Sequence, residues 1–213
     1  MALLIGIAGG SGSGKTTVAQ ALARRLGGRA VLLAEDAYYG EWADAPGFDP
    51  AAFDFDDVAA RDHALMLDHL RALKAGGRVA APRYDFVTHR RVGTDPVGPA
   101  EAVVVEGLHL FCTPQVAAVF DLRVYVDTPA DIRFIRRLIR DQAERGRTAD
   151  SVIAQYLRTV RPAHLRQVEP SRTAAEILLM DETPAVRLTD PAAADRLIAP
   201  ILADPRVAAL LPA

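Results

Sequence analysis

Short apolar runs recur along the chain and are separated by stretches with the spacing of amphipathic helices. The runs cover residues 3–8, 30–34, 101–107, 122–127 and 176–179. Each has the length of a buried strand, and the segments between them place apolar residues three or four positions apart. Strands that alternate with helices in this way predict an α/β fold with a doubly wound parallel sheet flanked by helices.

Helical spacing is found at 18–26, 57–75, 114–119, 151–164 and 190–202, and in a further segment that begins at Thr128-Pro129. We expect Thr128 to cap its helix and Pro129 to occupy the first turn. Gly76-Gly77 marks the end of the second helix. Residues 190–213 are expected to form a surface helix and a tail.

Two segments lack this helical spacing. Residues 37–56 combine aromatic and acidic residues with helix breakers, which predicts an ordered loop that forms the wall of a pocket. Residues 78–94 change to short extended pieces, which predicts a small β excursion off the main sheet.

The first apolar run ends in a glycine-rich motif, Gly9-Gly10-Ser11-Gly12-Ser13-Gly14-Lys15-Thr16, directly before a helix. This spacing matches G-x-x-x-x-G-K-[ST], in which backbone N–H groups and the helix N-terminus hold nucleotide phosphates. The motif therefore predicts a P-loop NTPase fold and a bound Mg-nucleotide. The expected nucleotide-binding residues are Gly9, Gly10, Ser11, Gly12, Ser13, Gly14, Lys15, Thr16 and Thr17.

Two acidic residues follow predicted strands, where open α/β sheets carry functional side chains. Asp36 comes after the strand at 30–34, and Glu106 ends the apolar run at 101–107. We expect Asp36 to lie near the P-loop and Glu106 to take the place of a Walker-B acid beside Mg²⁺.

Six arginines fall within fifteen residues in the segment that follows Pro129. Four of them have the spacing of one helix face, and they are Arg133, Arg136, Arg137 and Arg140; Arg145 and Arg147 follow. Such a face can be solvated and paired with Asp131, Asp141 and Glu144, or it can cover the charge that develops in phosphoryl transfer. The presence of a P-loop in a nearly neutral chain favours the second reading.

Composition limits the remaining classes of function. The chain has 213 residues, half of them hydrophobic, and a formal net charge of −2, which predicts one domain and argues against nucleic-acid or membrane-surface binding. The single cysteine, Cys112, cannot form an internal disulfide, and no apolar run is long enough to span a bilayer. With no leader-like segment at the start, we expect a cytoplasmic protein.

Several separate segments together resemble the uridine kinase (uridine/cytidine kinase) family, over about residues 5–177. They are the P-loop; Asp36 with Tyr38-Tyr39; Phe48-Asp49 and Phe53-Asp54; Tyr84-Asp85-Phe86 with His89; Val105-Glu106-Gly107; and residues 131–147 with Gln155-Tyr156 and Arg161-Pro162. The resemblance implies an Arg-rich helical lid at 129–164, with Asp36 and Glu106 on strands on either side of the P-loop strand.

The resemblance also implies roles for individual residues. Asp36 would be the general base for the nucleoside 5′-hydroxyl, and Asp49 and Arg137 would hold the ribose. Tyr84 and His89 would bind the pyrimidine edge. Phe48 and Phe86 would pack near the base, Arg147 and Gln155 would approach it from the lid, and Lys15, Arg140 and Arg145 would contact the phosphates, while Thr16, Glu106 and Asp36 would bind Mg²⁺.

The implied reaction is phosphorylation of uridine and cytidine with Mg-ATP, with GTP as an alternative donor. The resemblance further implies a homotetramer and inhibition by CTP or UTP. The sequence departs from the family in a shorter loop between Tyr39 and Phe48, in Pro50 where His is usual, in Ala174 where Tyr is usual, and at 180–184, where adenine contacts are expected.

Three other functions stay open from the sequence alone. The chain could phosphorylate another small alcohol, such as pantothenate, ribulose phosphate or nicotinamide riboside, although the segment 84–89 argues against these. It could be a regulatory NTPase, although it has no Asn-Lys-x-Asp element for guanine. It could also be a nucleotide-binding paralogue of low activity, although Lys15, Asp36 and Glu106 are all present.

Overall fold

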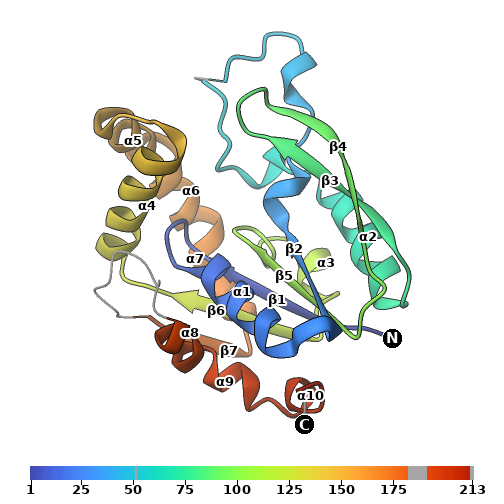
Figure 1. Ribbon diagram of the computed structural model, residues 1–213. Coiled ribbons are helices and arrows are strands. Elements are labelled where there is room, and N and C mark those ends of the chain that lie inside the picture. The colour runs from blue at the N-terminus through green and yellow to red at the C-terminus, as the bar shows by residue number, and fades with distance from the viewer. Residues whose placement is uncertain (51, 182–190, 212–213) are drawn as a thin grey trace.

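The predicted strands form one parallel sheet (Figure 1). The computed structural model describes residues 1–50, 52–181 and 191–211. The strands lie in the order β2-β5-β1-β6-β7, and their bounds in that order are Ala30–Ala34, Ala102–Gly107, Leu3–Gly9, Leu122–Asp127 and Ile177–Met180. The strand that leads into the P-loop is therefore central, which confirms the α/β fold with a doubly wound sheet.

The apolar runs are continuous because both faces of the sheet are covered. In β1, Leu4 and Ala8 pack into one hydrophobic cluster, and Ile5 and Ile7 pack into the other. Helix α1 (Lys15–Leu26) covers the second face, and helices α2 (His63–Lys74) and α3 (Pro114–Ala117) cover the first. A half-exposed sheet would instead show alternating polar residues.

The C-terminal segment is helical, as predicted, but it is divided into several short helices, and one side of them packs into the core. It forms three short helices, α8 (Pro191–Leu197), α9 (Ala199–Leu202) and α10 (Pro205–Ala208). Ile198, Ile201 and Val207 are fully buried in the cluster that also contains the apolar face of α1. Asp190, where the helix was predicted to begin, lies outside the described residues.

Helix α2 begins later than its spacing predicted. Asp62 caps it by accepting a hydrogen bond from the Leu65 N–H at 3.0 Å. Asp57, the predicted start, instead accepts from the Ala59 N–H and caps a short 3-10 turn at Val58–Ala60. Two Asp residues compete as caps here, and spacing alone does not decide between them.

The β excursion is confirmed as an antiparallel hairpin. Strands β3 (Val79–Asp85) and β4 (Arg90–Val97) pair only with each other among the described strands, and β4 extends three residues beyond the predicted end. The hairpin lies above α2 in Figure 1, and the turn at 86–89 carries His89 in a left-handed conformation with φ of 55°.

The lid begins with α4 (Ala130–Arg145) and continues through α5 (Ala149–Gln155). Helical backbone then extends past the predicted end at 164 as far as Ala174, through α6 (Arg161–Ala163), α7 (Glu169–Ser171) and a 3-10 turn at Arg172–Ala174. Wider π turns at Tyr156–Val160 and His164–Val168 precede Pro162 and Pro170. Because proline clashes with the carbonyl four residues earlier, a widened turn lets the helix continue.

Thr128 does not cap α4. Its hydroxyl donates to the Ser13 carbonyl at 3.0 Å, and Pro129 occupies the cap position without a side-chain hydrogen bond. The hydroxyl thus ties the start of the lid to the P-loop.

Candidate active site

The P-loop packs directly against the first turn of the lid. Gly12 has φ of 82°, and a Cβ at this position would overlap with the carbonyl oxygen of Arg133. Gly14, with φ of 89°, precedes α1 so that Lys15 becomes its first residue. The glycines of the motif therefore satisfy both the backbone curl and the close approach of α4.

The two strand-end acids lie on the same side of β1, because β5 and β2 follow it in that direction. The implied placement on either side of the P-loop strand is therefore wrong. Glu106 pairs in register with Ile7 of β1 and with Ala34 of β2, and Asp36 follows in the 3-10 turn Glu35–Tyr38. Both acids still face the P-loop end of the sheet.

Electrostatic coupling connects these acids to the P-loop. Burial raises the pKa of Glu106, and the charge of Lys15 and a hydrogen bond with the Thr16 side chain offset only part of that shift. For Asp36, burial acts in the same direction, but the charges of Arg61 and Lys15 outweigh it and lower the pKa below its ordinary value. Asp36 is thus an ionised carboxylate near neutral pH.

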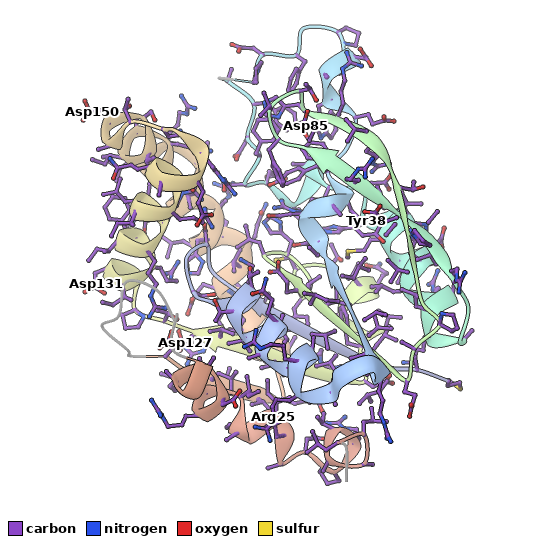
Figure 2. The ribbon with its side chains drawn as sticks, viewed as in Figure 1. Arg25, Tyr38, Asp85, Asp127, Asp131 and Asp150 are labelled. Atoms are coloured by element: carbon purple, nitrogen blue, oxygen red, sulfur yellow. The ribbon has the colours of Figure 1, made fainter. Side chains whose placement is uncertain are left out.

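A cavity of about 870 Å³ opens between the hairpin and the lid. In Figure 2 the labelled Asp85, at the end of β3, and Asp150, in α5, mark these two arms. The cavity brings together eleven residues of the predicted site, which are Ser11, Lys15, Asp36, Tyr84, Phe86, His89, Arg137, Arg140, Arg145, Arg147 and Gln155. Phe48 and Asp49 are not among the residues that line it.

Aromatic rings form the hairpin side of the cavity. The His89 ring stacks on Phe55 with centroids 4.7 Å apart and an interplanar angle of 20°, and Tyr84 contacts Phe86 edge-on. The Tyr84 hydroxyl and the His89 Nδ1 are buried and have no hydrogen-bond partner within the described chain. Because buried polar atoms are nearly always paired in native proteins, these two atoms indicate a ligand that supplies the partners.

Asp56 is a cavity residue that sequence reasoning missed. It is 7% exposed, accepts a hydrogen bond from the Thr159 hydroxyl at 2.8 Å, and has a pKa raised by burial despite the nearby charge of Arg137. The chain contains three Phe-Asp pairs, at 48, 53 and 55, and the resemblance was assigned to the first. When Phe55-Asp56 is taken instead, the loop after Tyr39 is no longer short.

The backbone of Asp49 begins a turn in the loop. Its carbonyl oxygen accepts hydrogen bonds from the Ala52 and Phe53 N–H groups and starts a turn.

Arg133, Arg136 and Arg137 share the buried face of α4, as their spacing predicted, but only some of the lid arginines reach the cavity. Arg133 donates to the Thr128 carbonyl and to His164, and Arg136 pairs with the buried Asp181 at 2.7 Å. Neither residue lines the cavity. Ile135 is 44% exposed while several arginines of α4 are buried, so the polarity of the helix is inverted relative to a typical surface helix.

The other arginines surround Asp141, which is fully buried. The guanidinium of Arg140 donates twice to Asp141 Oδ1, at 2.9 and 2.8 Å. Three more arginines place a nitrogen within 3.5 to 3.8 Å of the same carboxylate, and they are Arg137, Arg145 and Arg147. The alternative interpretation, a solvated basic face, is therefore wrong about solvation, although the pairing with Asp141 that it included is present.

Two of these arginines reach other parts of the cavity. Arg137 donates to the Ser11 hydroxyl of the P-loop at 2.8 Å and to Gln155 Oε1 at 3.0 Å. Arg145 lies over the Phe86 ring, 5.7 Å from its centroid. The lid thus contacts both the phosphate end and the aromatic end of the cavity.

Glu35 and Arg61 form a buried pair that sequence reasoning did not identify. Glu35 accepts hydrogen bonds from His63 Nε2 at 2.8 Å and from the His109 N–H at 2.9 Å. Burial opposes its ionisation, but the His63 hydrogen bond and the Arg61 charge lower the pKa of Glu35 to about 2. Arg61 comes from the loop before α2, where no sequence signal marks it.

A P-loop, a strand-end carboxylate and an arginine-rich lid around one cavity define this protein as a P-loop kinase, which transfers a phosphoryl group from a nucleotide donor to a small molecule. The chain belongs to the Phosphoribulokinase / Uridine kinase family, whose model matches residues 4–187.

Two similar curated proteins carry the name uridine kinase. The protein from Chloroflexus aggregans (strain MD-66 / DSM 9485) is 46% identical over 178 residues, which are 83% of this chain and 85% of the relative. The protein from Clostridium botulinum (strain 657 / Type Ba4) is 42% identical over 179 residues, 83% of this chain and 87% of the relative.

Among solved structures, the phosphoribulokinase from Rhodobacter spheroides superposes with a TM-score of 0.63 at 20% identity, over 89% of this chain and 75% of its own. This likeness supports the fold. Within the described part of the chain, no helix combines the length and apolarity that a membrane crossing requires. The expected departure at 180–184 falls mostly outside the described residues.

Proposed function

We propose that the chain phosphorylates the 5′-hydroxyl of uridine and cytidine with Mg-ATP. One observation carries this proposal: a single cavity has an aromatic end with two unpaired buried polar atoms, on Tyr84 and His89, and a phosphate end with Lys15 and Asp36. The names of the curated relatives support the same acceptor.

The aromatic end fits a pyrimidine. Tyr84 can donate or accept through its hydroxyl, and the His89 Nδ1 can do either, depending on which ring nitrogen carries the proton. A base with a 4-keto group or a 4-amino group therefore finds a partner, which is why we include both uridine and cytidine. The side chains of Arg147 and Gln155 contact each other and form the lid side of the proposed base site.

We assign the ribose hydroxyls to Asp56 and Arg137, in place of the Asp49 and Arg137 pair expected from the resemblance. Asp56 lines the cavity, and the positive charge of Arg137 lowers its pKa in part, whereas Asp49 does not line the cavity. A carboxylate accepts hydrogen bonds from vicinal hydroxyls, and a guanidinium donates to them, so the two groups suit a diol.

The sugar assignment predicts different effects at two aspartates. Asp56→Asn should raise the KM for uridine roughly tenfold or more, because a charge-assisted hydrogen bond is worth about 1.5 to 3 kcal/mol. Asp49→Asn is the matched control and should change that KM by less than about twofold. Steady-state kinetics with uridine as the varied substrate measure both KM values. A larger increase in Asp49→Asn than in Asp56→Asn would assign the ribose hydroxyls to Asp49 instead.

For the chemical step, Asp36 would take the proton of the 5′-hydroxyl as that oxygen attacks the γ-phosphorus. Lys15, Arg140 and Arg145 would carry positive charge next to the transferred group. Thr16, Glu106 and Asp36 provide a hydroxyl and two carboxylates, a donor set that suits Mg²⁺ held mainly by nucleotide phosphates and water. Bound Mg²⁺ would neutralise phosphate charge.

His89 provides a test of the base site. His89→Ala should raise the nucleoside KM roughly tenfold while the ATP KM changes by less than about twofold, because only the nucleoside loses a hydrogen bond and only the aromatic wall loses the ring that stacks on Phe55. Equal increases in both KM values would remove His89 from the base site. His69→Ala is a suitable control, because His69 contacts Tyr38 and does not line the cavity.

The acceptor is tested by measuring ADP release with uridine, cytidine, adenosine, pantothenate, ribulose 5-phosphate and nicotinamide riboside. We expect turnover with uridine and cytidine and little with the others. Turnover with a non-nucleoside alone would replace the proposed substrate by another small alcohol, and nucleotide hydrolysis without any acceptor would favour a regulatory NTPase. The same proposal has further parts. The donor is ATP in preference to GTP, and the reaction serves pyrimidine salvage in the cytoplasm. The enzyme is a homotetramer that CTP or UTP inhibits.

A further inference from the structure

Arg61 is a buried cation that contacts the proposed base directly. Its side chain is 2% exposed, and its Nη2 donates to Asp36 Oδ1 at 2.9 Å and to the Tyr39 hydroxyl at 2.7 Å. Its other terminal nitrogen donates to the Phe55 carbonyl at 3.3 Å, and the guanidinium lies 4.2 Å from the centroid of the Tyr39 ring. These contacts fix the guanidinium from several directions.

This arrangement engages only one of the two carboxylate oxygens of Asp36. The Asp36 side chain is 46% exposed at the cavity, although the arginine that holds it is almost completely buried. Oδ1 accepts the hydrogen bond from Arg61, and no other described residue donates a hydrogen bond to Oδ2. One carboxylate oxygen is therefore anchored to the protein, and the other is available to a hydroxyl in the cavity.

Asp36 has a competing cation close by. The positive charge of Lys15 acts on Asp36 as well, and a lysine that serves nucleotide phosphates cannot also hold a carboxylate without losing part of that role. A second, rigid guanidinium removes this competition. The guanidinium is itself held by the Tyr39 hydroxyl and the Phe55 carbonyl, so it reaches Oδ1 from a fixed direction, which an ammonium on a flexible stem would not do.

We propose that Arg61 is a positioning residue for phosphoryl transfer, which holds Asp36 by one oxygen so that the other faces the acceptor hydroxyl. The proposal rests on the proposed function, since it needs Asp36 to act on an acceptor. Arg61 itself acts through Asp36 and through the wall residue Tyr39, and it needs no contact with the substrate.

A purely structural role for Arg61 is the alternative. Its Nε lies 3.7 Å from Glu35 Oε2, so its removal also affects a buried carboxylate. Loss of folded protein would lower the apparent kcat in proportion to the inactive fraction and leave both KM values unchanged. It would not respond to a small guanidinium ion in solution, and it would be equally severe for a comparable arginine that does not contact Asp36.

Arg91 is that comparable arginine. Its side chain is 18% exposed, donates to the Tyr39 carbonyl at 3.1 Å and pairs with Asp62 at 3.1 Å, and neither contact involves Asp36. Arg61→Ala and Arg91→Ala therefore both remove a partly or fully buried guanidinium beside Tyr39, and only the first frees Asp36.

The experiment compares Arg61→Ala, Arg61→Lys, Arg91→Ala and Asp36→Asn by active-site-normalised kinetics, with and without millimolar guanidinium chloride. We expect Arg61→Ala to lower kcat roughly tenfold or more, the scale of a misplaced catalytic group, with an ATP KM within about twofold of the unmodified enzyme. Added guanidinium should restore part of that loss, and the same concentration of NaCl should not. Arg91→Ala should keep its kcat and show no rescue.

Arg61→Lys keeps the positive charge and loses the planar guanidinium, so its kcat should lie between those of the unmodified enzyme and Arg61→Ala. It also provides the test if the alanine variant does not fold. A normal kcat in Arg61→Lys together with the absence of guanidinium rescue, or a normal kcat in Arg61→Ala, would overturn the proposal. Failure of the proposed function has a different signature, because Asp36→Asn would then retain its turnover or uridine would not be a substrate.

Discussion

Asp36→Asn is expected to lower kcat by roughly two orders of magnitude or more, the scale of the loss of a general base, while nucleotide binding stays nearly intact. The amide has the same size as the carboxylate and can still accept a hydrogen bond from Arg61, so the local geometry is preserved. It cannot take a proton from the acceptor hydroxyl. The change therefore removes the chemistry and leaves the positions of the other groups unchanged.

The measurement is kcat with uridine under saturating ATP, together with the dissociation constant of a nonhydrolysable ATP analogue. Asp95→Asn is a matched control, because Asp95 lies on the exposed strand β4 and pairs weakly with Arg83 at 3.8 Å. A turnover within about threefold of the unmodified enzyme in Asp36→Asn would refute the base assignment.

The sequence predicted the sheet well because its inner strands β5 and β1 are buried on both faces, and continuous apolar runs are then unavoidable. It predicted the P-loop for a similar reason: the motif contains both the geometric requirement, glycines at φ of 82° and 89°, and the charged residue Lys15. Local patterns suffice where the fold and the function depend on the same few neighbouring residues.

The order of the strands could not be obtained in the same way. Asp36 and Glu106 follow different strands, and their expected placement on either side of β1 was wrong although both faced the correct end of the sheet. Strand order is set by how the connecting helices pack, and apolar runs of similar length carry no information about which of them become neighbours.

The lid was predicted least well, since helical spacing shows which side chains share a face and does not show which way that face turns. Arg133 and Arg136 were expected beside the phosphates, but each finds a buried partner elsewhere, in His164 and in Asp181. These partners are 31 and 45 residues away in the chain. A buried polar pair of such separation leaves no periodic signal.

Asp56 and Arg61 illustrate a second limit. Both lie in an irregular loop, and both gain their significance from burial against Arg137 or Asp36, which only the folded chain creates. A repeated Phe-Asp pair did mark Asp56 in the sequence, but there are three such pairs, and only the folded chain shows that Phe55 stacks on His89 and that Asp56 lines the cavity.

Asp141→Asn is expected to lower the free energy of unfolding by about 3 kcal/mol, within the range measured when one partner of a buried ion pair is removed. Asp141 is fully buried and receives two hydrogen bonds from Arg140, and three other guanidiniums lie within 4 Å of it. An asparagine would leave these positive charges close together without their shared counter-ion.

Bound phosphates should partly replace the lost carboxylate, since they bring negative charge to the cavity that Arg140 and Arg145 line. Urea unfolding with and without ATP measures both effects, and the stabilisation by ATP should be larger in Asp141→Asn than in the unmodified protein. Asp131→Asn is the control: Asp131 lies in the first turn of the same helix and is exposed, so its loss should cost less than about 1 kcal/mol. Equal costs for the two variants would mean that the arginines of the lid do not depend on Asp141 as their counter-ion.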